Sequence, residues 1–125
     1  MIYLDTHVLL WLDAKKESLF PERVKKLLET EDLLISPAVY LEIEFLYEAG
    51  RITEHAETVV DSLSARIPLR FCTMPFESVA RKAAQLRWTR DPFDRMIVAS
   101  ALCSDAVLIT KDREILDNYH KALWK

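Results

Sequence analysis

Four carboxylates occupy positions where an acidic side chain is costly unless something compensates it. Asp5 directly follows the apolar run 2–4, and Asp112 comes two residues after the apolar run 106–110. Asp94 shares a predicted helix face with the apolar residues three, four and seven positions later, and Glu42 has apolar residues one turn before and one turn after it. A carboxylate on a core-facing stripe destabilises a fold unless it is paired, hydrogen-bonded or bound to a metal ion.

Carboxylates that gather in one place repel one another. Two unit charges about 4 Å apart cost roughly 1 kcal/mol in water and about 4 kcal/mol at an effective dielectric of 20, so an uncompensated cluster spreads apart or takes up protons. A divalent cation removes this repulsion. Ligation by Asp and Glu oxygens, without a pattern of His and Cys ligands, favours Mg²⁺ or Mn²⁺ over zinc. The acids therefore predict a site for a hard cation.

Each acid also has an ordinary structural explanation. Asp5 and Asp112 can cap the helices that follow them, and Asp94 can offset the positive end of a helix. Glu42 can pair with an arginine such as Arg95. Single residues therefore decide little, whereas the joint placement of four acids at one edge of one sheet favours a functional site.

Strands and helices alternate along the chain around these acids. Short apolar runs predict strands over 2–4, 33–35, 69–73 and 106–110, with a terminal edge strand over 122–124. Periodicity and capping residues predict helices over 7–14, from 21 onward, over 37–49, 53–66, 75–86, 93–103 and 112–116. This order predicts a single domain, 1–125, with a three-layer α/β/α fold and a central, mainly parallel sheet of four to five strands. In such sheets, ligands bind beyond the carboxyl ends of the strands.

The composition is that of a globular protein. The 125 residues are half apolar and 30% charged, with one glycine and five prolines, which excludes a collagenous or disordered chain. No apolar run approaches the roughly 20 residues that cross a bilayer. The N-terminus lacks the features of a signal peptide, so we expect a cytoplasmic protein. Cys72 and Cys103 form neither a redox motif nor a disulfide framework, and we expect both to be buried.

Charge is distributed unevenly along the chain. The net charge is −3, which does not by itself indicate a nucleic-acid binder. Residues 1–65 carry 6 basic and 13 acidic groups, whereas residues 66–125 carry 11 basic and 7 acidic groups. If a metal neutralises the acids at positions 5, 42, 91, 94 and 112, 17 basic groups stand against 15 acidic ones. Repulsion of a polyanion is then not inevitable.

Three sequence motifs around the acids are distinctive. They are Asp5-Thr6-His7 followed by Val8-Leu9-Leu10-Trp11, the stretch Arg90-Asp91-Pro92-Phe93-Asp94-Arg95 with the apolar helix after it, and Leu108-Ile109-Thr110-Lys111-Asp112. Together with Glu42 after Ser36, they resemble PIN-domain ribonucleases, and within that family most closely the toxin ribonucleases of VapC type. The resemblance covers the whole chain, and D-P-F-D-R is its most specific part.

The resemblance implies an acidic site that is both catalytic and metal-binding. By position, this site falls on Asp5, Glu42, Asp94 and Asp112, with Asp91, Thr6 and Thr110 as accessory residues. Asp91 alone would otherwise be a turn residue. Thr89 stands where near relatives often have histidine, so any role of that histidine is in doubt here. His7 either supports the site from outside the metal ligands or packs within the first helix.

The family activity implied is Mg²⁺- or Mn²⁺-dependent endoribonuclease chemistry. A metal-activated water attacks an RNA phosphorus in line and leaves 5′-phosphate and 3′-hydroxyl ends. Basic residues around a tryptophan offer phosphate contacts and a stacking surface, unless they are a solvated helix face with a packed tryptophan. The RNA-binding candidates are Arg90, Arg95, Lys111, Arg113 and Trp88.

The resemblance also implies protein partners. We expect a homodimer and a cognate antitoxin whose tail covers the acidic site through a basic side chain. The second and third helices supply either a partner surface or core side chains in Phe20, Tyr40, Leu41 and Tyr47.

Other classes of protein share parts of the pattern. A phosphatase with an aspartyl nucleophile would show D-x-D after the first strand, where this chain has Asp5-Thr6-His7. A receiver domain needs an acceptor aspartate after the third strand, where Cys72-Thr73-Met74 has none. A PIN-like module that binds RNA or protein without cutting is the third alternative, and the complete set of four acids argues against it.

Overall fold

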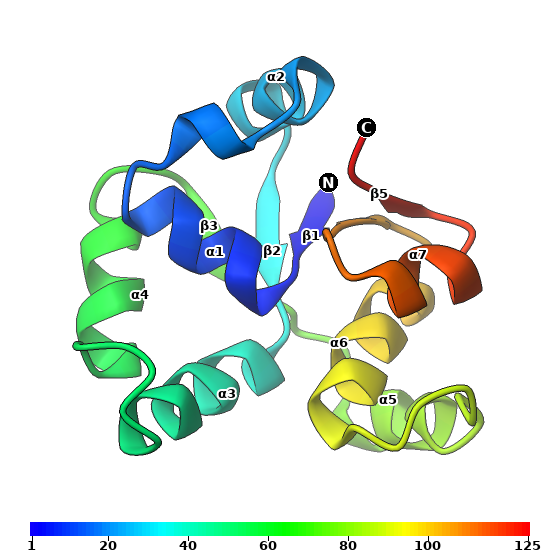
Figure 1. The fold of residues 1–125 in the computed structure, drawn as a ribbon. Helices are drawn as coiled ribbons and strands as arrows, with labels where there is room; N and C mark the ends of the chain where they lie inside the picture. The colour runs from blue at the N-terminus through cyan, green and yellow to red at the C-terminus, as the bar shows by residue number, and fades with distance from the viewer.

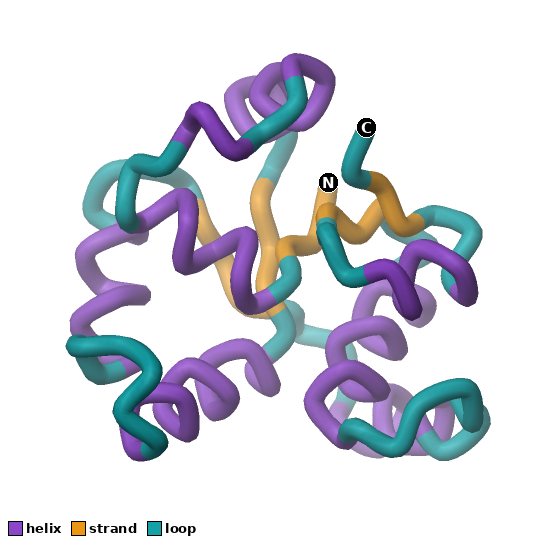
Figure 2. Tube along the Cα trace, in the orientation of Figure 1, coloured by secondary structure: helices purple, strands orange, loops and turns teal.

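The computed structural model describes all residues, 1–125, as alternating strands and helices (Figures 1 and 2). The elements are β1 (Ile2–Leu4), α1 (Thr6–Asp13), the 3₁₀ helix η1 (Glu17–Leu19), α2 (Glu22–Thr30), β2 (Leu33–Ile35), α3 (Pro37–Glu48), α4 (Ala56–Ser64), β3 (Leu69–Phe71), α5 (Phe76–Ala83), α6 (Pro92–Cys103), β4 (Val107–Ile109), α7 (Arg113–Asn118) and β5 (Ala122–Leu123).

The five strands form one parallel sheet in the order β3-β2-β1-β4-β5. Ile2 of β1 is paired with Leu33 of β2 on one side and with Val107 of β4 on the other. Right-handed crossovers place α1 to α4 on one face of the sheet and α5 to α7 on the other, as Figure 1 shows. The predicted three-layer α/β/α fold is confirmed.

The direction of the chain across the sheet reverses between β1 and β4. The chain runs from β1 outward through β2 to β3, then returns to β4 and continues to β5 on the opposite side. Such a point is where parallel sheets open a crevice at the carboxyl ends of their strands. The segments that follow β1 and β4 therefore meet there.

Burial in the core explains why the central strands are apolar. β1 and β2 are buried along their whole length, because helices cover both of their faces. β3 is an edge strand whose Arg70 and Phe71 are exposed, so its apolar run is not buried on both faces as the others are. No helix of the fold combines the length and hydropathy that crossing a membrane requires.

Several boundaries differ from the sequence-based expectation. α1 begins at Thr6, because Asp5 is its N-cap. α4 begins at Ala56 rather than at residue 53, and the Glu44 carboxylate accepts the Ala56 N–H at 3.0 Å, which fixes the start of the helix. β3 and α5 each end earlier than predicted, and η1 was not predicted. Cys72 is buried as expected, but Cys103 is partly exposed.

Candidate active site

Asp5 lies at the junction of β1 and α1. Its Oδ1 accepts the Thr6 N–H at 2.8 Å, which caps α1, and its Oδ2 accepts a 2.6 Å hydrogen bond from the Thr110 hydroxyl. Burial raises the pKa of Asp5, and the hydrogen bonds from Thr110 and Thr6 oppose this rise. The carboxylate is thus held in place at the end of the central strand.

Thr110 joins the end of β4 to this carboxylate. Its side chain is fully buried, and its Oγ1 also accepts the Asp112 N–H at 3.0 Å. Asp112 in turn caps α7, since its Oδ1 accepts the Ile115 N–H at 3.0 Å. The loop after β4 therefore places Asp112 beside Asp5. The Oδ2 atom of Asp112 accepts no hydrogen bond and is free to bind a ligand.

Glu42 reaches the same place from α3. This helix starts with Ser36 as N-cap and a first-turn proline, and Glu42 accepts a hydrogen bond from the buried Thr6 hydroxyl. Burial raises the pKa of Glu42, with further increases from the nearby Asp5 and Asp91 charges. The alternative that Glu42 pairs with Arg95 is wrong, because neither residue takes part in an ion pair.

Arg95 has another partner, because the Arg95 Nε–H donates to the Thr89 carbonyl oxygen at 2.7 Å. Thr89 is buried. Its Oγ1 accepts the Asp91 N–H at 3.2 Å. Thr89 thus orders the turn before α6 and does not line the acidic site.

Asp91 and Asp94 come from the first turn of α6. Asp91 is the N-cap, and its Oδ1 accepts the N–H groups of Phe93 at 2.8 Å and Asp94 at 3.2 Å. The Asp94 carboxylate itself accepts no hydrogen bond. Burial raises the pKa of Asp94 to about 7, and the charges of the four other acids add to the rise.

The five acids line one cavity of about 440 Å³, here called the acidic cavity. None of the seven ion pairs of the structure includes any of these acids. Their mutual repulsion is therefore not relieved by an ion pair within the protein. The lining residues are Asp5, His7, Val8, Trp11, Glu42, Asp91, Asp94, Lys111 and Asp112.

The donor set fits a hard divalent cation. Both carboxylate oxygens of Asp94, and one each of Asp91, Asp112 and Glu42, accept no hydrogen bond, and oxygen is the ligand that Mg²⁺ and Mn²⁺ prefer. No three acidic, histidine or cysteine side chains stand ready as a metal-binding group.

The amino-acid sequence of the chain matches the profile of a known domain family. The sequence profile described as PIN domain matches residues 2–121. The chain belongs to the PIN-domain family. A search of curated protein sequences found no match.

Solved structures with the same fold as this PIN domain cover almost the whole chain. VapBC2 from Rickettsia felis, bound to a DNA fragment from its promoter, aligns with a TM-score of 0.70 at 18% identity, covering 100% of both chains. VapBC-1 from nontypeable Haemophilus influenzae aligns with a TM-score of 0.66 at 23% identity, covering 100% of this chain and 97% of that one. A toxin–antitoxin complex from Klebsiella pneumoniae gives 0.66 at 17% identity, covering 98% and 96%. At these identities, the likeness establishes the fold.

The predicted RNA-binding residues of the PIN domain are scattered. Lys111 lines the acidic cavity, with its Nζ 5.9 Å from the Trp11 ring centroid and 6.0 Å from that of Trp124. Arg113 is exposed on α7, and Arg90 is exposed before α6. The other two are only partly exposed. Arg95 is held by its hydrogen bond to the Thr89 carbonyl oxygen, and Trp88 packs against the core. Lys111 alone joins the acids.

Two residues of α1 belong to the site that sequence reasoning did not assign to it firmly. His7 and Trp11 are one turn apart, their rings are 6.1 Å apart, and both line the acidic cavity. His7 thus both contacts its helix neighbour and faces the site. The signal in the sequence was the spacing of four between His7 and Trp11 in the helix that follows Asp5, which puts both on one helix face.

An apolar face lies beside the site, between α3, α5 and α6. Leu41 and Phe76 are 50% and 74% exposed, and Phe45 packs edge to face on Phe93 at 5.3 Å. A cavity of about 480 Å³ in this face has no charged residue in its lining. Of the side chains expected to be either core or partner surface, Phe20 is core and Leu41 is exposed.

Proposed function

We propose that this PIN domain is a Mg²⁺- or Mn²⁺-dependent endoribonuclease of the VapC toxin type. The observation that carries the proposal is Asp94, a half-buried carboxylate that accepts no hydrogen bond and has no cationic partner among four other acids. A fold maintains such a cluster at a cost unless a divalent cation compensates it. The VapBC names of the solved structures that share the fold support the toxin class.

The chemistry follows from the roles that the residues can take. A divalent cation would supply a Lewis acid that activates water and stabilises negative charge on a phosphate. Asp5 and Asp94 are the principal ligands, Asp112 binds directly or through a water, and Glu42 is a ligand or orients the attacking water. No serine, cysteine or histidine nucleophile is required, and the expected RNA products end in 5′-phosphate and 3′-hydroxyl groups.

The remaining polar residues position these acids. Thr6 and Thr110 donate hydrogen bonds to Glu42 and Asp5, which favours the ionised form of each carboxylate against the effect of burial and fixes its direction. Asp91 is an accessory acid that caps α6 through one oxygen and faces the acidic cavity. Lys111, held over the two tryptophan rings, contributes a cation at the rim of the cavity.

Incubation of the purified protein, freed of any antitoxin, with total RNA and Mg²⁺ or Mn²⁺ tests the proposal. We expect cleavage that EDTA abolishes and that Asp5→Asn and Asp94→Asn reduce by at least about a hundredfold. Glu48→Gln is the matched control, since Glu48 is exposed at the end of α3 and outside the acidic cavity. Sequencing of the cut ends would name the target RNA.

The test also separates the alternative functions. Uncut RNA that still binds would favour a non-catalytic PIN-like module and contradict the enzyme. Phosphate incorporated from a small phosphodonor would favour a phosphatase or receiver-like domain. The nuclease proposal expects no such incorporation, because no acid of the cavity is required as a phosphoacceptor.

The proposal includes two protein partners and a place of action. A cognate antitoxin would cover the acidic cavity with a basic side chain, because the cavity has a net negative charge. A second copy of the chain would cover the apolar face, since an exposed apolar surface without charges is typical of protein interfaces. We place the enzyme in the cytoplasm, where RNA and antitoxin are both present.

A further inference from the structure

Two more cavities border the acidic cavity and share residues with it. The first, here called the α1 cavity, has a volume of about 520 Å³ and shares His7 and Trp11 with the acidic cavity. The second, here called the α7 cavity, has a volume of about 510 Å³ and shares Lys111. The three cavities therefore adjoin one another through shared lining residues, with the acids in the middle.

Cations without an acidic partner line the α1 cavity. Lys16 and Arg51 take part in no ion pair and no side-chain hydrogen bond, although both are exposed and free to find one. Asp13 of the same cavity is already paired with Arg66 at 3.0 Å. Glu54 alone remains as an unpaired acid. With Arg66 counted beside its partner Asp13, the α1 cavity has a small positive balance, next to the strongly negative acidic cavity.

The α1 cavity also has an apolar floor of a size that suits a nucleotide. Leu10, Leu46, Ile52 and Val59 line it, with Trp11 at the border to the acidic cavity. Its volume lies within the range of about 300–1,000 Å³ found for small-ligand pockets. A ring with a π-face fits such a floor, whereas the flanking cations fit a phosphate.

The α7 cavity repeats the positive balance on the other side. Lys111, Arg113 and Lys125 line it against one acidic side chain, Asp117. Neither Lys111 nor Arg113 is in an ion pair. Trp124 continues the aromatic contact from Trp11, with ring centroids 5.9 Å apart. Cations and aromatic rings therefore flank the acids on both sides.

We infer that a single strand of RNA runs from the α1 cavity over the acidic cavity to the α7 cavity, with Lys16 and Arg51 holding phosphate on one side and Arg113 on the other. The inference rests on the proposed function and names the path of its substrate. A polyanion matches a cationic surface on each side of a metal-loaded centre. A basic antitoxin tail would be attracted by the acids of the acidic cavity only, and the cations of the α1 and α7 cavities would repel it on both sides.

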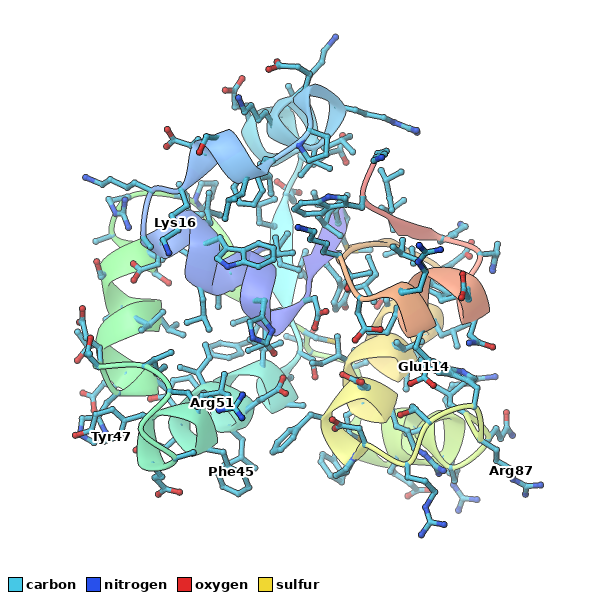
Figure 3. All side chains as sticks on the ribbon, viewed as in Figure 1. Lys16, Phe45, Tyr47, Arg51, Arg87 and Glu114 are labelled. Atoms are coloured by element: carbon cyan, nitrogen blue, oxygen red, sulfur yellow. The ribbon has the colours of Figure 1, made fainter.

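Of the RNA-binding residues expected from the sequence, the path keeps Lys111 and Arg113, and it adds Lys16 and Arg51. Arg90, Arg95 and Trp88 lie off the path. Figure 3 shows Lys16 and Arg51 on the α1 and α3 side of the molecule, and Arg87 at the opposite end. Arg87 is exposed, lines no cavity and makes no ion pair. It is therefore a matched control for the removal of a surface cation.

Fluorescence anisotropy with a labelled, mixed-sequence RNA of about 12 nucleotides tests the path. All proteins carry Glu42→Gln, which removes the carboxylate proposed to orient the attacking water but keeps Asp5 and Asp94 for Mg²⁺, so that the RNA stays intact. We expect the double variant Lys16→Ala with Arg51→Ala to bind at least about tenfold more weakly. Its slope of log K against log salt should fall by about 1.4, since single strands give about 0.7 per neutralised phosphate. Arg113→Ala should lower the slope by about 0.7, and Arg87→Ala should leave binding unchanged.

Several outcomes would overturn the path. Binding by the double variant that equals that of the Glu42→Gln parent would do so, as would an Arg87→Ala effect of the same size or no RNA binding at all. Displacement of the RNA by polyglutamate at equal concentration would show a surface that recognises charge alone.

Cleavage assays in the otherwise unaltered chain distinguish this inference from the proposed function. If the wild type cuts RNA and the double variant cuts with the same kcat/KM, the path is wrong and the nuclease stands. If the wild type does not cut but the double variant loses binding, the nuclease is wrong and the path stands.

Discussion

The Thr110 hydroxyl donates a 2.6 Å hydrogen bond to the Asp5 carboxylate, although 105 positions of sequence separate the two residues. The same hydroxyl accepts the N–H of Asp112 at 3.0 Å. One buried oxygen thus sets the positions of two acids that follow neighbouring strands. The sheet register that pairs Leu4 with Ile109 brings the two strand ends together.

Replacement of Thr110 by valine removes this oxygen while keeping the shape of the side chain. Asp5 then loses one of its two donors, and the Asp112 N–H loses its acceptor. We expect the free energy of unfolding in urea to fall by about 1–3 kcal/mol. RNA cleavage should fall as well, because the acids lose their fixed positions. Thr110→Ser keeps the hydroxyl and should retain most of both. Equal losses in the serine and valine variants would contradict the role of the hydrogen bonds.

Asp94 should make the metal-free protein less stable as the pH rises. Its pKa is raised to about 7 from 3.8 by burial and by the surrounding acids. Since the folded state holds this proton more tightly than the unfolded chain does, stability falls as the pH rises from about 4 to about 7 and stays low above that. The raised pKa values of Asp5 and Glu42 act in the same direction.

Urea unfolding in EDTA at about pH 5.5 and about pH 8 measures this effect. Because Asp94 is only half-buried, we expect a loss of about 1 kcal/mol at the higher pH. Asp94→Asn should flatten the dependence and be more stable than the wild type at about pH 8. A wild type that gains stability over this interval would rule out charge repulsion in the acidic cavity.

Leu41 should contribute to a contact between two copies of the chain. It is half-exposed on α3 in the uncharged apolar face, where a glutamate would place a charge in the interface. We expect Leu41→Glu to convert a dimer into a monomer in analytical ultracentrifugation. Leu19→Glu, at a side chain 43% exposed on η1, is the control and should leave the mass unchanged. A wild type that sediments as a monomer at micromolar concentration would remove the homodimer from the proposal.

The fold followed from local patterns because its strands and helix caps are local features. The runs 2–4 and 33–35 are strands at those positions, and Ser36 with Pro37 starts α3 as expected. β3 was predicted two residues too long. Cys72, just beyond the end of this edge strand, is still buried and donates its N–H to the Ile35 carbonyl oxygen at 2.8 Å. Apolar residues and burial therefore extend past the last paired residue, Phe71.

The acids of the site were found from their positions, but their surroundings were not. Asp5 and Asp112 follow strands that a parallel sheet must align, so their meeting follows from topology. Partners across the chain depend on side-chain direction in space, which spacing does not encode. Arg95 therefore turned out to bind the Thr89 carbonyl instead of Glu42. Lys111 likewise lies over two tryptophan rings that are 113 positions apart in the chain.

Titration calorimetry with Mn²⁺ or Mg²⁺ at about pH 8 tests most directly whether the acids exist to hold a cation. We expect saturable uptake by the wild type and by Glu48→Gln, and its loss in Asp94→Asn and Asp5→Asn. Absence of uptake by the wild type, or equal uptake by the Asp94→Asn protein, would contradict a metal site in the acidic cavity.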